Sequence, residues 1–343
     1  KKERGIIMTK KWKKAIALSL AALTLTGALA GCGDDKKAAS GAAKPAAGQT
    51  IKINFPTAGA SGALYAVGAA ITNMWSSQVP GVQASSQASA GGIANLNMVS
   101  EGEAQVSIAI SSNVYQCLNG TDSFKDHAYK DLKAIGGLYL NPNQVVATAN
   151  SGINSLKDVK GKHFAVASAG SSVYNECETH FTAAGLSFPD DIKAEYITFT
   201  DAADMLQNGS IDGAWIMSGA PASAVTQALT GGAHLVEIDD NLIKELKAKY
   251  PWYTSYTIKA GTYPNQDKDV KTSAIKMVMF CRGDLPEDVV YQLTKTLWEH
   301  MDELGQSQKN LKGLTAENAV KDIADIPLHP GAAKYYKEIG VLK

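Results

Sequence analysis

Five short segments rich in Gly, Ser, Thr and Ala contain the residues best suited to bind a small anion. Gly lets the backbone N–H groups approach a ligand closely, and Ser and Thr add hydroxyl donors. None of the four richest segments contains Lys, Arg, Asp or Glu, so neutral donors are expected to hold the ligand. The alternative is that small residues only permit tight turns. The segments are residues 56–62, 85–92, 111–113, 168–172 and 218–221.

Arginine, the usual two-point clamp for a carboxylate, is scarce. Only Arg4 and Arg282 are arginines among the 33 Lys and Arg residues. Arg4 precedes the apolar N-terminal run, and Arg282 is expected at the surface. We therefore predict a pocket that binds without an arginine.

No motif for catalysis or for a metal ion is found in the sequence. Gly-x-Ser-x-Gly, His-Glu-x-x-His and Walker patterns are missing, and the six histidines are scattered. Cys177 and His180 could share a helix face, but two ligands alone are a weak metal signal. Cys117, Cys177 and Cys281 are expected to be buried apolar residues, with one disulfide as the alternative. We predict a binding protein with no metal and no cofactor; an enzyme and a structural surface lipoprotein are the alternatives.

The five segments follow candidate strands and precede candidate helices. Residues 51–55 alternate like a strand, and a helical run covers 63–77. Strands are also predicted at 82–84, 105–110, 163–167 and 213–217, with helices beginning at Asn95, Val114 and Ala222 and another ending at Ala184. Serial strand, loop and helix units predict an α/β fold with largely parallel sheets, whose ligand site lies where strands end and helices begin.

The N-terminal region has the pattern of an export signal. Lysines 10, 11, 13 and 14 precede an uncharged run over 15–30, which is shorter than the ~20 apolar residues of a membrane span. Residues 29–32 (LAGC) resemble a bacterial lipobox, which implies cleavage before Cys32 and a lipid on its sulfur. We predict a signal peptide over 1–31, starting at Met8, and a lipidated tether over 32–49. An ordinary signal with an incidental cysteine is the alternative.

Read in order, the segments resemble the TAXI class of solute receptors of tripartite ATP-independent periplasmic (TRAP) transporters. The resemblance runs from about Ile51 to the C-terminus. Each matching segment alone would be a weak signal, but the segments together are specific for the family. They are PTAGASGALYAVGAAI, SAGGIANL, SIAISSNVYQCLNG, LKDVKGKHFAVASAGSSV, NGSIDGAWIMSGAP, AGTYPNQDKDVKT and IPLHPGAAKYYKEIG.

The resemblance implies a fold like that of type II periplasmic binding proteins, with two α/β domains that close on a small organic acid. Domain I would comprise 50–139 and 275–343, and domain II 140–274, joined by hinge strands. The ligand would be glutamate or a related C5 carboxylate. Candidate ligand-binding residues are Thr57, Gly59, Ser61, Gly62, Tyr65, Ser89, Gly91, Asn95, Ser111, Gly170, Ser171, Ser172, Val173, Trp215 and Gly219.

Several positions depart from the family pattern. Ser89 and Gly92 stand where the family usually has Thr and Ser, Ile110 and Ser112 where it has Gln and Asp, and Val173 where it has Thr. Because Gly92, Ile110 and Val173 cannot donate side-chain hydrogen bonds, the ligand is expected to be less polar than glutamate, or backbone amides and water supply the missing bonds.

The resemblance also implies an exported monomer, anchored to a bacterial membrane by its lipid. Its partners would be the membrane subunits of a TRAP transporter. Zero net charge argues against nucleic acid as a partner.

Overall fold

The computed structural model describes residues 50–250 and 252–343. The predicted signal peptide, Cys32 and nearly all of the tether lie outside these residues. Within them, no helix is both long and apolar enough to cross a membrane.

The strands coincide with the apolar and alternating runs of the sequence. β1 alternates between covered and open positions. β7, an inner strand of the larger sheet, and β3, an end strand that α2 and β1 contact, are buried along their whole length. The strands are β1 (Ile51–Pro56), β2 (Val82–Gln87), β3 (Val106–Ile110), β4 (Leu132–Ala147), β5 (His163–Ala165), β6 (Lys193–Glu195), β7 (Gly213–Met217), β8 (His234–Val236), β9 (Tyr253–Ile258) and β10 (Val270–Arg282).

The strands form two sheets, one of which is mixed. β1 and β2 make a parallel pair, and the larger sheet has the order β3-β10-β4-β7-β5-β6, with β8 added to β4 and β9 to β10. The α/β fold is confirmed, but the expectation of largely parallel sheets was wrong. β10 runs antiparallel to β3, β4 and β9, and β4 runs antiparallel to β7 and β8. The two long strands β4 and β10 therefore cross the sheet in opposite directions.

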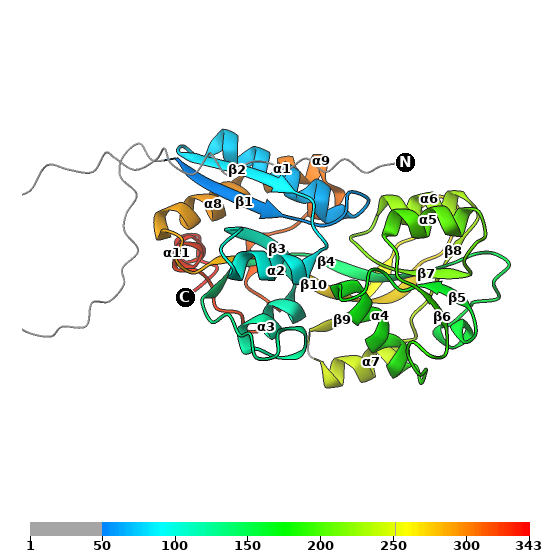
Figure 1. The fold of residues 1–343 in the computed structure, drawn as a ribbon. Coiled ribbons are helices and arrows are strands. Elements are labelled where there is room, and N and C mark those ends of the chain that lie inside the picture. Colours follow the sequence, from blue (N-terminus) through cyan, green and yellow to red (C-terminus); the bar gives the residue numbers. More distant parts are fainter. Residues whose placement is uncertain (1–49, 251) are drawn as a thin grey trace, which may run out of the picture. The chain divides into compact units, whose positions relative to one another are not determined.

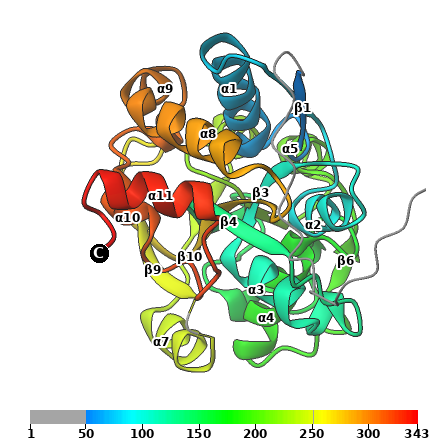
Figure 2. The same ribbon diagram turned by 90° about the vertical axis from the view of Figure 1, so that its left-hand side faces the viewer.

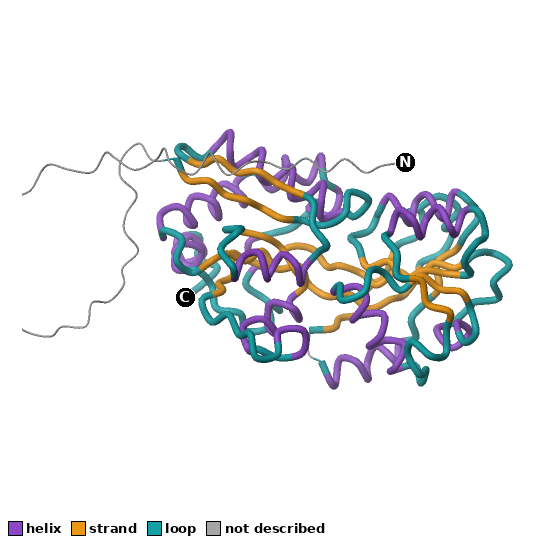
Figure 3. The backbone as a smooth tube through the Cα atoms, in the orientation of Figure 1, coloured by secondary structure: helices purple, strands orange, loops and turns teal. Residues whose placement is uncertain are grey.

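Helices lie on the outside of the strands (Figure 3). Several have side-chain N-caps, for example Ser171 before α4, Thr198 before α5 and Asp239 before α7. The helices are α1 (Ala63–Gln78), α2 (Gly92–Ser100), α3 (Ser111–Asn119), α4 (Ser172–Ala183), α5 (Phe199–Gln207), α6 (Ser223–Thr230), α7 (Asp240–Lys249), α8 (Glu287–Glu299), α9 (Met301–Ser307), α10 (Ala316–Ala319) and α11 (Pro330–Glu338), with 3-10 turns η1 (Asp122–Phe124), η2 (Leu156–Val159) and η3 (Lys309–Leu311).

Two helices begin three residues earlier than predicted. α2 starts at Gly92 instead of Asn95, because Gly91 has a φ of 100° that turns the chain directly into the helix. α3 starts at Ser111 instead of Val114, so residues 111–113 are helical and not a loop. The predicted limits of α1 and β7, the predicted end of α4 and the predicted start of α6 agree with the structure to within one residue.

Figure 1 shows two groups of elements linked by β4 and β10. We call β1 to α3 with α8 to α11 the terminal lobe, and β5 to α7 the central lobe. In the terminal lobe α8 packs against α11 beside the sheet (Figure 2). The domain boundaries at residues 139/140 and 274/275, within the long strands, stay a prediction.

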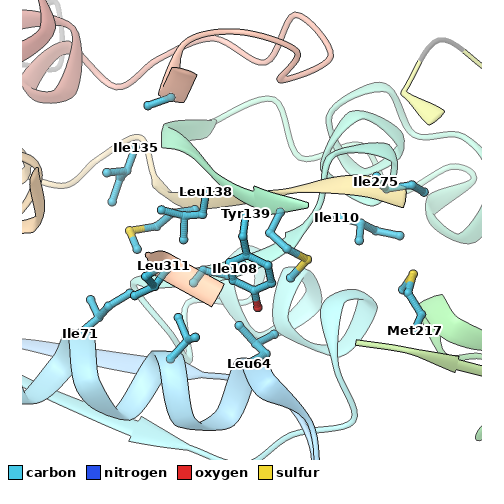
Figure 4. Close-up of a cluster of buried hydrophobic side chains, with 14 of the residues drawn as sticks. Leu64, Ile71, Ile108, Ile110, Ile135, Leu138, Tyr139, Met217, Ile275 and Leu311 are labelled. Carbon is cyan, nitrogen blue, oxygen red and sulfur yellow. The ribbon is translucent and has the colours of Figure 1, made fainter. Parts of the chain in front are cut away.

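Buried aliphatic side chains of β3, β4, β10 and α1 form the core beneath the helix starts. Tyr139 of β4 projects toward Leu64 of α1, with Ile108 and Ile110 of β3 beside it (Figure 4). Cys117, Cys177 and Cys281 are buried and unpaired, as predicted, and burial raises the pKa of the Cys117 thiol to about 11.

Candidate functional site

A cavity of ≈ 440 Å³ lies where four helices begin. Residues at the starts of α1 and α2 in the terminal lobe line one side, and residues at the starts of α4 and α5 in the central lobe line the other. We call this cavity the cleft. Because the first turn of a helix leaves N–H groups unpaired and carries the positive end of the helix dipole, four such ends favour an anion.

No Lys, Arg, His, Asp or Glu among the described residues lines the cleft. Among the described lining residues, the one ionisable group is the phenol of Tyr139, whose pKa is raised by burial. Arg282 pairs with Asp284 through Nε–Oδ1 at 2.9 Å and Nη2–Oδ2 at 2.5 Å, and it does not line the cleft. Polarity in the cleft therefore comes from hydroxyl, amide and backbone groups.

The start of α4 places two adjacent hydroxyls at the cleft. Ser171 Oγ accepts a hydrogen bond from the N–H of Tyr174 at 3.1 Å and so caps the helix. Ser172 is only 5% exposed, lines the cleft, and its Oγ has no hydrogen-bond partner among the described residues. A buried hydroxyl without a partner is unfavourable, so Ser172 Oγ is a ready contact for a polar group in the cleft.

The loop before α2 is held by a buried hydrogen-bond network. Asn95 Nδ2 donates to the carbonyls of Thr57 at 2.8 Å and Ile108 at 3.2 Å. Ser89 Oγ donates to Asn95 Oδ1 at 2.6 Å and accepts from the N–H of Gly91 at 3.0 Å. Thr57 and Asn95 thus position the residues that line the cleft without lining it themselves.

Contacts between the lobes lie beside the cleft. The N–H of Ala63, the first residue of α1, donates to Ser218 Oγ at 3.1 Å. Ser223 Oγ, on the first residue of α6, donates to the carbonyl of Ser61 at 2.7 Å. A Cβ added to Gly92 would lie 3.0 Å from Ser172 Oγ, so the starts of α2 and α4 approach each other closely.

The structure brings eight of the fifteen predicted binding residues together around the cleft. All eight belong to the starts of α1, α2 and α4 or to the loops before them. They are Gly59, Ser61, Gly62, Ser89, Gly91, Ser171, Ser172 and Val173.

The other seven predicted residues do not line the cleft. Besides Thr57 and Asn95, Ser111 and Trp215 are buried, and Tyr65 is partly exposed on α1. Gly170 has a φ of 72°, which suits a turn before α4. Gly219 lies against Asn310, whose Oδ1 is 2.7 Å from the place of an added Cβ.

Sequence reasoning missed the start of α5 and the long strands. Thr198, Phe199 and Thr200 line the cleft, as do Tyr139 and Asn141 of β4. Thr198 followed three residues later by Asp201 was a readable signal, because this spacing is a helix-start pattern, and Thr198 Oγ1 does cap α5. No local pattern indicates that Tyr139 or Asn141 faces a ligand.

The comparisons with known proteins agree with this architecture. A family model described as the NMT1-like family matches residues 55–340. The periplasmic binding protein BugD has 16% sequence identity and a TM-score of 0.53 over 84% of this chain and 98% of its own. A periplasmic transporter has 17% identity and a TM-score of 0.52 over 85% and 93%. A protein from Bordetella bronchiseptica RB50 has 17% identity and a TM-score of 0.50 over 85% and 89%.

At these identities the solved structures show a shared fold. The family match covers most of the chain, from the end of β1 to the end of α11. The chain therefore belongs to the NMT1-like family.

Proposed function

We propose that this protein is an extracytoplasmic receptor that captures a small organic acid and delivers it to a membrane transporter. The observation that supports this best is the cleft itself, which is uncharged and onto which four helix N-termini open. The periplasmic proteins that share the fold add support, because two of them are described as a binding protein and a transporter.

The carboxylate would lie at the start of α4, bound by the free N–H groups of its first turn and by Ser172 Oγ. Hydrogen bonds to a charged group contribute about 1.5–3 kcal/mol each. Two or three of them would supply most of the ~8 kcal/mol of a micromolar affinity. An arginine is therefore not required for binding.

The remaining lining favours an acid with an apolar body. Leu64, Ile110, Ile197, Met217 and Met277 all line the cleft. Without an Asp or Glu, the cleft offers no counter-charge to an α-ammonium group, whose burial would be costly. We infer that an organic acid without an amino group, less polar than glutamate, is the preferred ligand.

Delivery would involve the membrane subunits of a TRAP transporter, as the sequence resemblance implies. The protein would be a monomer held at the membrane by a lipid on Cys32. Domain II would close on domain I about the long strands. A ligand that touches both lobes stabilises the closed state, because its contacts on both sides exist only there.

Mass spectrometry of the small molecules that co-purify with the native protein tests the proposal most directly. We expect one organic acid, which calorimetry should then show to bind with saturation and to be released unchanged. Steady conversion of that acid would favour an enzyme. If no acid in a broad library binds or stabilises the protein, the result contradicts the proposed acid receptor and favours the structural lipoprotein.

A further inference from the structure

A second cavity, of ≈ 640 Å³, lies between α3 of the terminal lobe and α4 and α7 of the central lobe. It shares no lining residue with the cleft, although α4 borders both. The N-cap Ser171 and the first two residues of α4, Ser172 and Val173, line the cleft, whereas later residues of α4, including Asn175 and Thr179, line the second cavity. We call it the amine cavity, for the reasons that follow.

The side chains that line the amine cavity are mainly acidic, so the cavity favours a cation over a carboxylate. Among the described residues, four carboxyl groups line it, those of Asp122, Glu176, Glu178 and Glu245, together with the single ammonium group of Lys249. Glu178 and Glu245 are exposed at its rim, where they attract cations from solvent. Glu176 is buried, its Oε2 accepts a hydrogen bond from Tyr253 at 2.8 Å, and burial raises its pKa to about 7.

Two nearly buried polar side chains of α3 line the same cavity. Each has an atom without a hydrogen-bond partner among the described residues. Asn113 is 3% exposed; its Nδ2 donates to Gln116 Oε1 at 3.0 Å, but its Oδ1 accepts nothing. Ser112, 2% exposed, has a free Oγ. Since an amide oxygen can only accept, Asn113 Oδ1 requires an N–H or O–H donor. This requirement is an observation independent of the acidic side chains that line the cavity.

Aromatic rings form another wall of the amine cavity. Tyr250 and Trp252 are stacked with centroids 5.4 Å apart, and Tyr253 is next to them. The ammonium group of Lys249 already contacts one of these rings, because its Nζ lies 5.0 Å from the centre of the Tyr250 ring. The negative face of such a ring attracts cations.

We propose that the amine cavity binds a small organic ammonium ion that carries N–H donors, such as an alkylamine or diamine. Its ammonium group would donate to Asn113 Oδ1 and pair with the carboxylates, and its alkyl body would pack on the aromatic wall. This site is independent of the acid site in the cleft, and each can fail without the other.

Isothermal titration with 1,4-diaminobutane at low ionic strength tests the proposal. One amine should bind per chain. Glu178→Gln combined with Glu245→Gln should weaken binding about three- to tenfold, the range expected for loss of partly exposed ion pairs. Asn113→Ala should also weaken it, while thermal unfolding shows that the variant is folded.

Two further variants separate a site from general surface attraction. Lys249→Gln removes the competing ammonium and should strengthen binding, which a merely destabilised protein would not do. Asp302→Asn combined with Glu303→Gln removes the same two negative charges at exposed positions of α9 and should leave the affinity unchanged.

Three results would overturn the inference. The first is no binding of 1,4-diaminobutane by the native protein. The second is an equal loss of affinity in the Asp302→Asn/Glu303→Gln protein and in the Glu178→Gln/Glu245→Gln protein. The third is equal affinity for the hexamethylated 1,4-butanediammonium ion, which has the same two charges and the same alkyl chain but no N–H donor.

Discussion

Ser171 and Ser172 are neighbours at the start of α4, yet their hydroxyl groups have different roles. Ser171 Oγ is engaged in capping the helix, whereas Ser172 Oγ is buried at the cleft without a partner. Substitution of the first should therefore affect folding, and substitution of the second should affect binding.

Ser172→Ala is expected to weaken binding of the co-purifying acid about tenfold, the effect of losing one hydrogen bond to a charged group. The free energy of unfolding should stay the same or rise slightly, because no internal bond is lost. Ser171→Ala should instead lower it by about 1 kcal/mol through loss of the cap. Calorimetry and denaturant unfolding measure both. Arg282→Gln should leave binding unchanged; a large loss there would show an arginine clamp.

Glu176 and His180 form a buried pair on α4 whose pKa values are displaced in opposite directions. Burial raises the pKa of Glu176 from 4.5 to about 7 and lowers that of His180 from 6.5 to about 4. A carboxyl with a raised pKa keeps its proton in the folded state, so its contribution to stability declines as pH rises from about 4.5 to about 7. The neutral histidine contributes in the opposite sense between about pH 4 and 6.5.

Glu176→Gln isolates the first effect. The free energy of unfolding of the native protein, minus that of the variant, should fall as pH rises from about 5 to about 7 and stay level above that range. Both proteins contain His180, so the difference reports Glu176 together with its coupling to His180, whose Nδ1 lies 3.8 Å from Glu176 Oε2. Denaturant unfolding at a series of pH values measures it. A pH-independent difference would mean that Glu176 titrates near its ordinary pKa.

At the scale of elements, the starts of α1 and α6 join the two lobes. Ser223 Oγ on α6 donates to the carbonyl of Ser61 in the loop before α1, but Ser223 itself does not line the cleft. Ser223→Ala therefore tests closure without removing a ligand contact. We expect dissociation of the acid to become about two- to tenfold faster, as for loss of one neutral hydrogen bond.

Stopped-flow measurement of ligand release checks this expectation. Ser100→Ala is a matched control, because its hydroxyl also donates to a carbonyl, that of Asn97, but within α2 and away from the cleft. Equal release rates for all three proteins would show that the Ser223 contact does not stabilise the closed state.

At the scale of the whole molecule, the predicted lipid on Cys32 would decide where the receptor works. Cys32→Ser should move the protein from the membrane fraction to the extracytoplasmic fluid, because the acyl chains supply the membrane affinity. Cell fractionation with immunodetection measures the distribution. Cys281→Ala serves as control, since it removes a buried thiol at the end of β10 without burying a hydroxyl and should not affect location. Retention of Cys32→Ser at the membrane would contradict lipid anchoring.

The order of strands, small-residue loops and helices could be predicted from the sequence because it depends on local patterns. Periodic burial defines β1 and α1, and glycine and serine mark helix starts such as that of α4. The uncharged character of the cleft also follows from composition, since the described loop residues that line it include no charged residue.

Only the tertiary structure decided which helix starts meet. Ser111 and Ser172 both follow strands and are both the first residue of a helix, yet of the two only Ser172 lines the cleft. The antiparallel pairing of β4 and β10 sets the starts of α1 and α2 opposite those of α4 and α5. The same long-range pairing brings Asn113 of α3 beside Glu176 of α4 and Glu245 of α7 around the amine cavity. Residues so far apart in the chain leave no local pattern, so their meeting is a property of the fold alone.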